Sequence, residues 1–217
     1  MKERPIIFNG DMVRAILSGQ KTQTRQAVAN VRPDNCLTLR KPTKTKSGGH
    51  THVLDAPQHC LCPFGKVGDR LWVREACRAK ELESGLDVVC YPADQAETPI
   101  KAHPLDAGLW IDLYRYRGGK GKLVPSIHMP RWASRITLEI TGVRVERLND
   151  ISQEDAQAEG MELTGWRPTY ADPDSGGEVC TPYDNFAELW QSIYGAESWD
   201  ANPWVWVIEF KRMEATA

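Results

Sequence analysis

Residues 18–25 read SGQKTQTR, and the rest of the chain is organised around them. Asn9 offers an N-cap to a short preceding helix, whose apolar residues between 12 and 17 share one face. Gly19 suits the left-handed position that ends such a helix. A lysine, two threonines and an arginine then follow within residues 21–25. A solvated turn can have this composition too, but we interpret the stretch as the wall of a polar site.

Length and composition are those of an ordinary globular protein. The 217 residues suit one domain with insertions, and 41% of them are hydrophobic and 26% charged. A net charge of −2 excludes a uniformly basic nucleic-acid coat but leaves room for a local basic groove. No apolar run approaches the ~20 residues that cross a bilayer, and residues 1–5 lack the apolar core of a signal peptide. We therefore expect a cytoplasmic protein without a membrane partner.

One cluster contains the residue types that bind zinc. It comprises His50, His52, His59, Cys60 and Cys62, which Cys36 could join. The spacing is Cys-x-Cys rather than Cys-x-x-Cys, and no second paired knuckle follows. We therefore interpret the cluster as a histidine-rich surface loop with reduced cysteines, and we expect no metal and no cofactor.

Strands and helices alternate along the chain. Apolar patterns predict strands at 5–8, 71–73, 136–148 and 204–211, and helices at 153–159 and from Asp184 onward. Gly142 interrupts the third strand, which is typical of bent or bulged strands in barrels. These elements predict an α+β fold in which a small β-barrel carries flanking helices. Long loop insertions are expected at about 26–62, 76–123 and 164–183 of a single domain over 1–217.

Residues 70–74, RLWVR, have two distinct faces. Leu71 and Val73 alternate with Arg70, Trp72 and Arg74. The face that holds Trp72 is therefore either solvated or the wall of a site, and Arg74 is a candidate binding residue.

Residues 125–135, PSIHMPRWASR, are also dense in side chains that bind ligands. Arg131 and Arg135 suit the clamping of a phosphate, and Trp132 suits the stacking of a base. The alternative is that Trp132 fills the core while the arginines stay solvated.

Four motifs in this order resemble the ASCH domain of the PUA-like superfamily. They are Gly-x-Lys-Thr-x-Thr-Arg at 19–25, Gly-x-x-Gly-Asp-x-Leu-x-Val at 65–73, Ala-Glu-Gly at 158–160 and Trp-Val-Ile-Glu-Phe at 206–210. The chain is similar in particular to the longer ASCH proteins often encoded in prophages. The resemblance implies a PUA-like barrel and an RNA- or nucleoside-related role.

The resemblance also implies an activity. Similar compact proteins are amidohydrolases that remove the acetyl group from N4-acetylcytidine. Their catalytic residues correspond by motif to Lys21, Thr24 and Glu159 of this chain. Thr22 and Arg25 lie beside them as candidates for substrate binding.

The chemistry of these residue types sets conditions on such an activity. The Thr24 hydroxyl is a possible nucleophile but needs an adjacent base. Lys21 serves as that base only when uncharged, which requires burial or a neighbouring cation such as Arg25. Glu159 either passes a proton to the leaving nitrogen or holds Lys21 charged, and these roles conflict. In a regular strand Lys21 and Thr24 point to opposite faces, so their convergence requires a turn over 19–25.

Two other functions stay open. Lys21 and Arg25 could bind phosphate while the threonine hydroxyls donate hydrogen bonds, as in a non-catalytic RNA-binding module. A metal-independent ribonuclease would use the same cations with an acidic residue, and His128 is the only histidine candidate for its acid–base partner. In each case the expected partner is a modified nucleoside or RNA.

Overall fold

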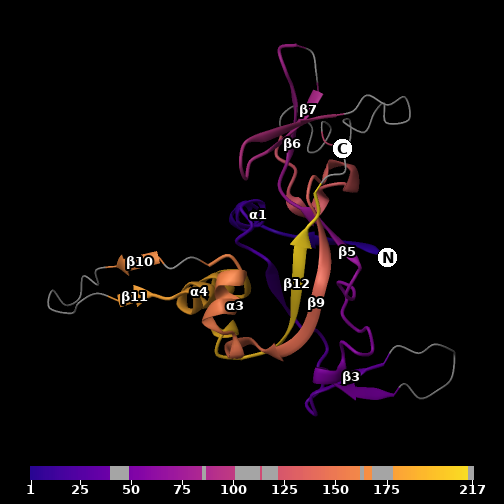
Figure 1. Ribbon diagram of the computed structural model, residues 1–217, viewed down its shortest axis with the longest axis vertical. Coiled ribbons are helices and arrows are strands. Elements are labelled where there is room, and N and C mark those ends of the chain that lie inside the picture. The colour runs from indigo at the N-terminus through magenta and orange to yellow at the C-terminus, as the bar shows by residue number, and fades with distance from the viewer. Residues whose placement is uncertain are drawn as a thin grey trace. The chain divides into compact units, whose positions relative to one another are not determined.

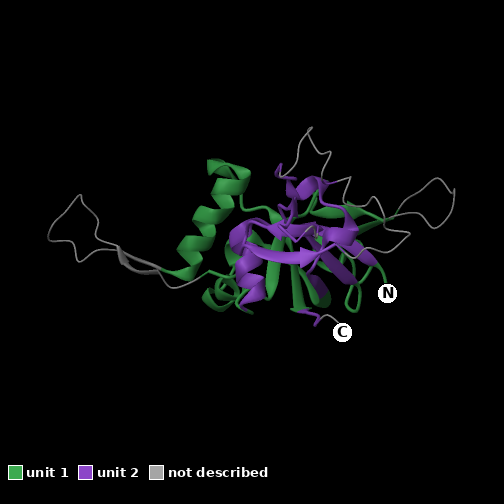
Figure 2. Ribbon diagram, turned by 90° about the horizontal axis from the view of Figure 1, so that it is seen from above, with its two compact units in different colours: residues 1–2, 19–69, 139–211 green, residues 3–18, 70–138, 212–217 purple. Residues whose placement is uncertain are grey.

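The computed structural model describes residues 1–39, 49–84, 87–100, 113, 122–161, 164–167 and 178–214. Contacts between Cα atoms divide the chain into two compact units, each assembled from segments far apart in sequence (Figure 2). Unit 1 comprises residues 1–2, 19–69 and 139–211, and unit 2 comprises residues 3–18, 70–138 and 212–217. The single domain over 1–217 stays a prediction.

Unit 1 is built on three neighbouring strands, in the order β9 (Thr137–Arg147), β12 (Trp204–Arg212) and β2 (Gln23–Ala27). The long strand β9 is curved and lies beside β12 (Figure 1). β2 is antiparallel to β12, with Thr24 opposite Ile208 and Arg25 opposite Val207. The predicted terminal strand at 204–211 is therefore confirmed.

Both faces of β12 are buried. Val205 and Val207 belong to a hydrophobic cluster with Phe186 and Trp190 of α4 (Pro182–Tyr194) and Ala156 of α3 (Gln153–Ala158). Trp206 and Ile208 are equally buried, and strand alternation places them on the other face. β12 thus separates a helix-covered face of the sheet from a second buried face.

The helices of unit 1 begin and end at identifiable caps. Ser152 caps α3 by accepting a hydrogen bond from the Asp155 N–H, and Gly160 follows the helix at a φ of 92°. This helix agrees with the sequence prediction. The prediction that Asp184 caps the next helix is wrong, because Thr181 is the N-cap of α4 and Asp184 completes a capping box with it.

β9 changes the phase of its alternation around Gly142. Leu138 and Ile140 are buried in its first half, whereas Val145 is buried in the second half. This change is typical of the β-bulge predicted at this glycine. Gly142 also makes room for Glu209 of β12, because an added Cβ would lie 2.4 Å from a Glu209 carboxylate oxygen.

Short hairpins lie inside two of the predicted insertions. Within 26–62, β3 (Cys36–Thr38) pairs antiparallel with β4 (His50–His52), and a 3₁₀ turn, η1 (Val53–Asp55), follows. Within 164–183, β10 (Thr164–Arg167) pairs with β11 (Glu178–Cys180). The loop interpretation of 26–62 missed the first hairpin, because strands of three residues are too short to show an alternating pattern. Further 3₁₀ turns of unit 1 are η5 (Leu148–Asp150) and η6 (Ala196–Ser198).

Unit 2 contains a parallel strand pair and an antiparallel sheet. β1 (Glu3–Ile7) is parallel to β5 (Arg70–Arg74), and α1 (Gly10–Leu17) follows β1 with the predicted Asn9 N-cap. β6 (Arg78–Glu81), β7 (Asp87–Tyr91) and β8 (Ala96–Pro99) form the second sheet, which lies within the predicted insertion at 76–123. The apolar run at 88–91 lies within β7, and the apolar run at 109–111 lies outside the described residues. The turns η3 (Ser126–His128) and η4 (Arg131–Ala133) contribute Met129 and Ala133 to the core of this unit.

The architecture agrees with the predicted α+β class, since several sheets are combined with few helices. The PUA-like barrel stays a prediction. No helix in the described part of the chain is long and apolar enough to cross a membrane.

Candidate functional site

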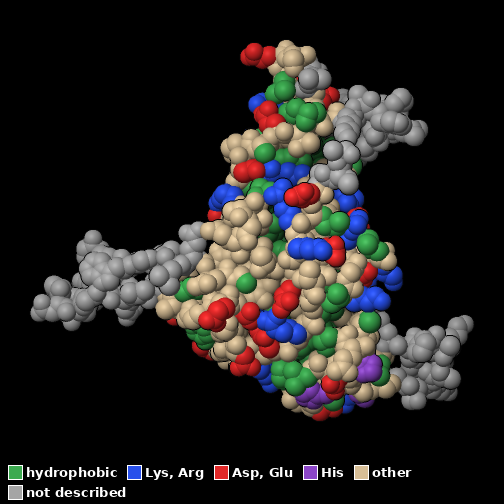
Figure 3. All heavy atoms as spheres, in the orientation of Figure 1, with side chains coloured by type: hydrophobic (Ala, Val, Ile, Leu, Met, Phe, Trp, Pro, Cys, Tyr) green, Lys and Arg blue, Asp and Glu red, His purple; other side chains and the backbone are tan. Residues whose placement is uncertain are grey.

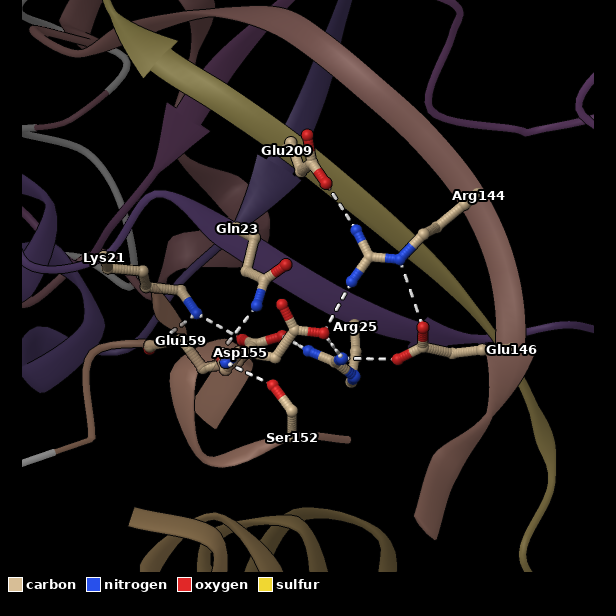
Figure 4. Close-up of polar contacts among 9 residues, drawn as sticks. All are labelled: Lys21, Gln23, Arg25, Arg144, Glu146, Ser152, Asp155, Glu159 and Glu209. Atoms are coloured by element: carbon tan, nitrogen blue, oxygen red, sulfur yellow. Dashed lines mark hydrogen bonds and ion pairs between the residues drawn. The ribbon is translucent and has the colours of Figure 1, made fainter. Parts of the chain in front are cut away.

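A buried cluster of charges in unit 1 contains three of the residues singled out in the sequence. Lys21 Nζ donates hydrogen bonds to the Glu159 carboxylate, at 2.6 Å, and to the Glu159 carbonyl oxygen, at 2.9 Å. Arg25 Nη1 donates to the second oxygen of the same carboxylate at 3.1 Å (Figure 4). The side chains of Lys21 and Arg25 are 0% exposed and that of Glu159 is 3% exposed. One carboxylate thus bridges two cations out of contact with water.

A second layer of charges surrounds this inner group. Arg25 also donates to Glu146 of β9 and, at 2.8 Å, to Asp155 of α3. Arg144 of β9 donates to Asp155 at 2.6 Å, to Glu146 at 3.1 Å and to Glu209. This outer layer is partly exposed, since the Arg144 side chain retains 37% of its accessible surface. The network therefore extends from the interior of unit 1 to its surface. It joins β2, β9 and β12 to α3.

Local geometry explains why these side chains meet. Gln23 and Arg25 lie two residues apart on β2, so they point to the same face of the strand. Gln23 donates to the Asp155 carbonyl oxygen at 2.6 Å, which shows that this face is the one covered by α3. Asp155 and Glu159 are four residues apart, at α3 and its C-cap, so they share one side of the helix.

The buried charges stabilise the fold only when every charged group of the cluster has its partner of opposite charge. Each buried ion costs several kcal/mol of lost hydration, which its partners must offset. Burial disfavours the charged form of Asp155, but hydrogen bonds from Gln23 and Arg25 and the charge of Arg144 outweigh it and lower the pKa of Asp155. Arg25 Nε has no hydrogen-bond partner.

The two threonines of the motif are not part of this network. Thr24 pairs with Ile208 in the ladder, and alternation directs its side chain to the face opposite to Gln23 and Arg25. Thr22 is exposed, and its N–H donates to the Ala158 carbonyl oxygen. The structure thus brings Lys21, Arg25 and Glu159 together. Thr24 does not join them, because residues 23–27 form an extended strand and not the turn that their convergence required.

An open cavity of about 390 Å³ lies beside the cluster. Its lining includes Gln20 and the two residues on either side of Glu159, Ala158 and Gly160. Lys21 and Glu159 themselves do not line it. A ligand in this cavity would contact the residues next to Lys21 and Glu159 in the chain, and not the charged groups of these two residues.

A second group of candidate residues lies on the outer face of β5 in unit 2. We call Arg70, Trp72, Arg74 and Arg131 the Trp72 face. The guanidinium carbons of Arg74 and Arg131 lie 5.3 Å and 5.7 Å from the centroid of the Trp72 ring, within the range of cation–π attraction. Leu71 and Val73, which alternate with these residues, are fully buried.

The Trp72 face carries an excess of positive charge. Arg131 pairs with Glu3 at 3.1 Å. Arg74 instead donates to two neutral carbonyl oxygens, those of Met129 and Ile127, and Arg70 Nε is buried without a partner. Among the described residues neither Arg70 nor Arg74 forms an ion pair. No salt bridge within the described ranges therefore neutralises either arginine, and Glu3 lies opposite Arg70 in the β1–β5 register.

The other two predicted binding residues have structural contacts. Arg135 makes two hydrogen bonds to the buried Glu75 carboxylate, at 2.8 and 2.9 Å, and pairs with Asp94. Its guanidinium also lies 4.0 Å from the centroid of the Tyr91 ring. Trp132 packs against the core of unit 2, as in the core-filling alternative.

The histidine- and cysteine-rich segment has a different arrangement from a zinc knuckle. Figure 3 shows histidine side chains gathered over the β3–β4 hairpin and the segment after it. Arg32 contacts His50 at 2.7 Å, and the His52 ring packs edge-on against Trp204. Within the described ranges, no group of three or more His, Cys, Asp or Glu side chains is placed to hold a metal ion.

Sequence reasoning missed most of the outer charge layer. Arg144, Glu146 and Glu209 lie on strands whose alternation was recognised, but nothing in the sequence pairs them with β2 or α3. The sequence feature that could have indicated the network is the four-residue spacing of Asp155 and Glu159, which places both carboxylates on one side of a helix.

Comparisons with protein-family models, with curated proteins and with solved structures find no match to this chain. The assignment of a function therefore depends on the geometry of these two groups of residues.

Proposed function

We propose that this protein is an RNA-binding module that holds single-stranded RNA on the Trp72 face. The observation that carries the proposal is the Trp72 ring flanked by Arg74 and Arg131, on a face where Arg70 and Arg74 form no salt bridge with any described residue. Aromatic rings and guanidinium planes stack bases, and uncompensated arginines bind phosphates. The motif resemblance to the PUA-like ASCH domain, with its small barrel, supports the same role.

The spacing along β5 suits an extended strand of RNA. Arg70 and Arg74 are four residues apart, so their Cα atoms lie about 13 Å from each other with Trp72 midway. A base stacked at Trp72 would have a cation on either side for the flanking phosphates. Bases in a duplex are already paired and stacked, so we expect a single strand to bind more tightly than a duplex.

The test is a titration of the full chain against a labelled single-stranded RNA, followed by fluorescence anisotropy at several salt concentrations. Trp72→Ala should weaken binding about tenfold or more, because one base stacked on an aromatic side chain contributes roughly 1–3 kcal/mol. Arg70→Gln should lower the slope of log K against log salt by about 0.7, the value for one phosphate contact on a single strand. Arg78→Gln removes the same charge from exposed β6 and is the matched control. Unchanged affinity in the Trp72 and Arg70 variants would reject the proposal.

A second candidate function is the deacylation of N4-acetylcytidine or a similar acylated nucleoside. The contact between Lys21 and Glu159 favours it, because both belong to the resembling motif and are distant in sequence. Against it, Lys21 already donates to two oxygens of Glu159, and Thr24 points to the other face of β2. The RNA-binding proposal therefore ranks first.

Mass spectrometry of acylated nucleosides and short RNAs after incubation separates these functions. The RNA-binding proposal expects both to survive intact. Acetate release that is lost in Lys21→Ala and Thr24→Ala, with circular dichroism unchanged, would place deacylation first. RNA cleavage that resists chelators and is lost in Lys21→Ala would favour the ribonuclease.

A further inference from the structure

A separate cavity of about 430 Å³ lies in unit 1, at the end of β2. We call it the Trp206 cavity. Its lining residues come from the end of β2 and the segment after it, from β3, from the segment before β5 and from β12: Ala27, Val28, Ala29, Asn30, Leu37, Thr38, Leu61, Pro63 and Trp206. Trp206 lies on the face of β12 opposite to Val205 and Val207, so the cavity belongs to the other side of the sheet from the buried charges.

The chemistry of this lining is selective. Leu37, Leu61, Pro63 and the Trp206 indole form apolar walls, and none of the described lining residues carries an ionisable side chain. Against these described walls a charged ligand would lose its hydration without gaining a partner of opposite charge. Within the part of the lining that the structure describes, Asn30 carries the one amide side chain and Thr38 the one hydroxyl group. The lining therefore suits an uncharged molecule that has apolar surface and a few hydrogen-bonding groups.

The walls of the cavity are held in place from behind. The Val28 N–H donates to the Trp204 carbonyl oxygen at 2.8 Å, and Trp204 Nε1 donates to Asn35 Oδ1 at 2.9 Å. The Val53 N–H donates to the Asn35 carbonyl oxygen at 2.8 Å, which ties the β3–β4 hairpin to the same point. Asn30 adopts a left-handed φ of 59°, a conformation that asparagine tolerates better than most residues. These hydrogen bonds join the end of β2, the start of β12 and the β3–β4 hairpin, which are three of the segments that carry lining residues.

We propose that the Trp206 cavity binds a small uncharged heterocycle of the purine type. The volume falls within the range of about 300–1,000 Å³ that is typical of small-molecule sites, and mostly apolar walls with few polar groups are their usual lining. An asparagine amide forms paired hydrogen bonds with the edge of adenine, and the exposed Asn30 is among the residues that line the cavity. This inference does not depend on RNA binding at the Trp72 face.

The test is ligand-observed NMR and calorimetry of the full chain with free adenine. Asn30→Gly removes the amide while keeping a residue that adopts positive φ readily, and it should weaken adenine binding about tenfold. Gln95→Gly is the matched control, because Gln95 is exposed in unit 2 with a φ of 60°. The control should bind adenine as the wild type does. Adenosine monophosphate, which carries charge, should bind more weakly than adenine.

Three results would overturn the proposal. One is the absence of adenine binding to the wild type at millimolar concentration. Another is equal affinity in Asn30→Gly and wild type. The third is loss of adenine binding in Trp72→Ala, which would assign the base to the Trp72 face. Retention of adenine by Trp72→Ala, together with weakened RNA binding, would support both proposals separately.

Discussion

Lys21 Nζ lies 2.6 Å from a carboxylate oxygen of Glu159, although 138 residues separate the two along the chain. Both side chains are buried, and Arg25 contacts the other oxygen of the same carboxylate. Glu159 therefore holds the C-terminal end of α3 against β2. The contact makes this glutamate a structural determinant of unit 1, whichever function the protein has.

Glu159→Gln should destabilise the protein strongly. The substitution keeps the shape of the side chain but leaves Lys21 and Arg25 without their shared counter-charge. Removing one member of a buried ion pair typically costs about 3–5 kcal/mol. The free energy of unfolding from urea denaturation measures the effect, and Glu188→Gln on exposed α4 is the control. Equal stability of the two variants would contradict a buried ionic network.

Gly142→Ala should destabilise the protein by no more than about 1 kcal/mol, because the half-exposed Glu209 carboxylate can swing away at the cost of its ion pair with Arg144. The added methyl group would collide with Glu209, which approaches Gly142 closely and bonds to Arg144. The cost should be smaller when Glu209 is already alanine, since the methyl group then has space. A double-mutant cycle by urea denaturation measures this coupling. If the changes in unfolding free energy of the two single variants simply add in the double variant, the added methyl group does not collide with Glu209.

The pair formed by Asp94 and Arg135 should stabilise the protein at neutral pH and lose its effect in acid. The hydrogen bond from Arg135 lowers the pKa of Asp94 below its ordinary value. A carboxyl group with a lowered pKa in the folded state contributes stability above its unfolded pKa, about 3.9 for aspartate, and that stability falls as the pH drops through the folded-state pKa.

The variant Asp94→Asn tests this pair. The difference in unfolding free energy between wild type and variant should be present at pH 7 and should shrink as the pH falls through the lowered folded-state pKa of Asp94. Asp150→Asn, at an exposed site, should show no comparable change with pH. A difference that stays constant with pH would mean that the ionised form of Asp94 is not what stabilises the fold.

Cys60 should react with iodoacetamide long before Cys77. Cys60 is exposed, whereas burial and the nearby Glu75 raise the pKa of Cys77 to about 12. The thiolate is the reactive form, so at pH 8 Cys77 is both shielded and protonated. Mass spectrometry of digested protein after timed alkylation measures the two rates, and urea should remove the difference. Comparable rates in the native protein would contradict the buried position of Cys77.

The sequence alone determined the features that depend on near neighbours in the chain. Asn9, Ser152 and Gly160 begin or end helices through contacts within one turn, and the Asn9 cap was predicted correctly. The alternation of residues 70–74 likewise separated Trp72 and its arginines from the buried Leu71 and Val73. Each of these patterns is a local consequence of helix or strand geometry.

Only the tertiary structure decided which distant side chains meet. It turned Lys21 and Arg25 toward α3 and directed Thr24 to the opposite face, because β2 is fixed in antiparallel register with β12. It also paired β3 with β4 in a hairpin. Arg135 forms ion pairs with Glu75 and Asp94, whereas the sequence pattern predicted a ligand-binding or solvated residue. These outcomes depend on packing between segments far apart in the chain. Local propensity carries no information about such partners, because the energy of a buried charge is set by the groups that surround it.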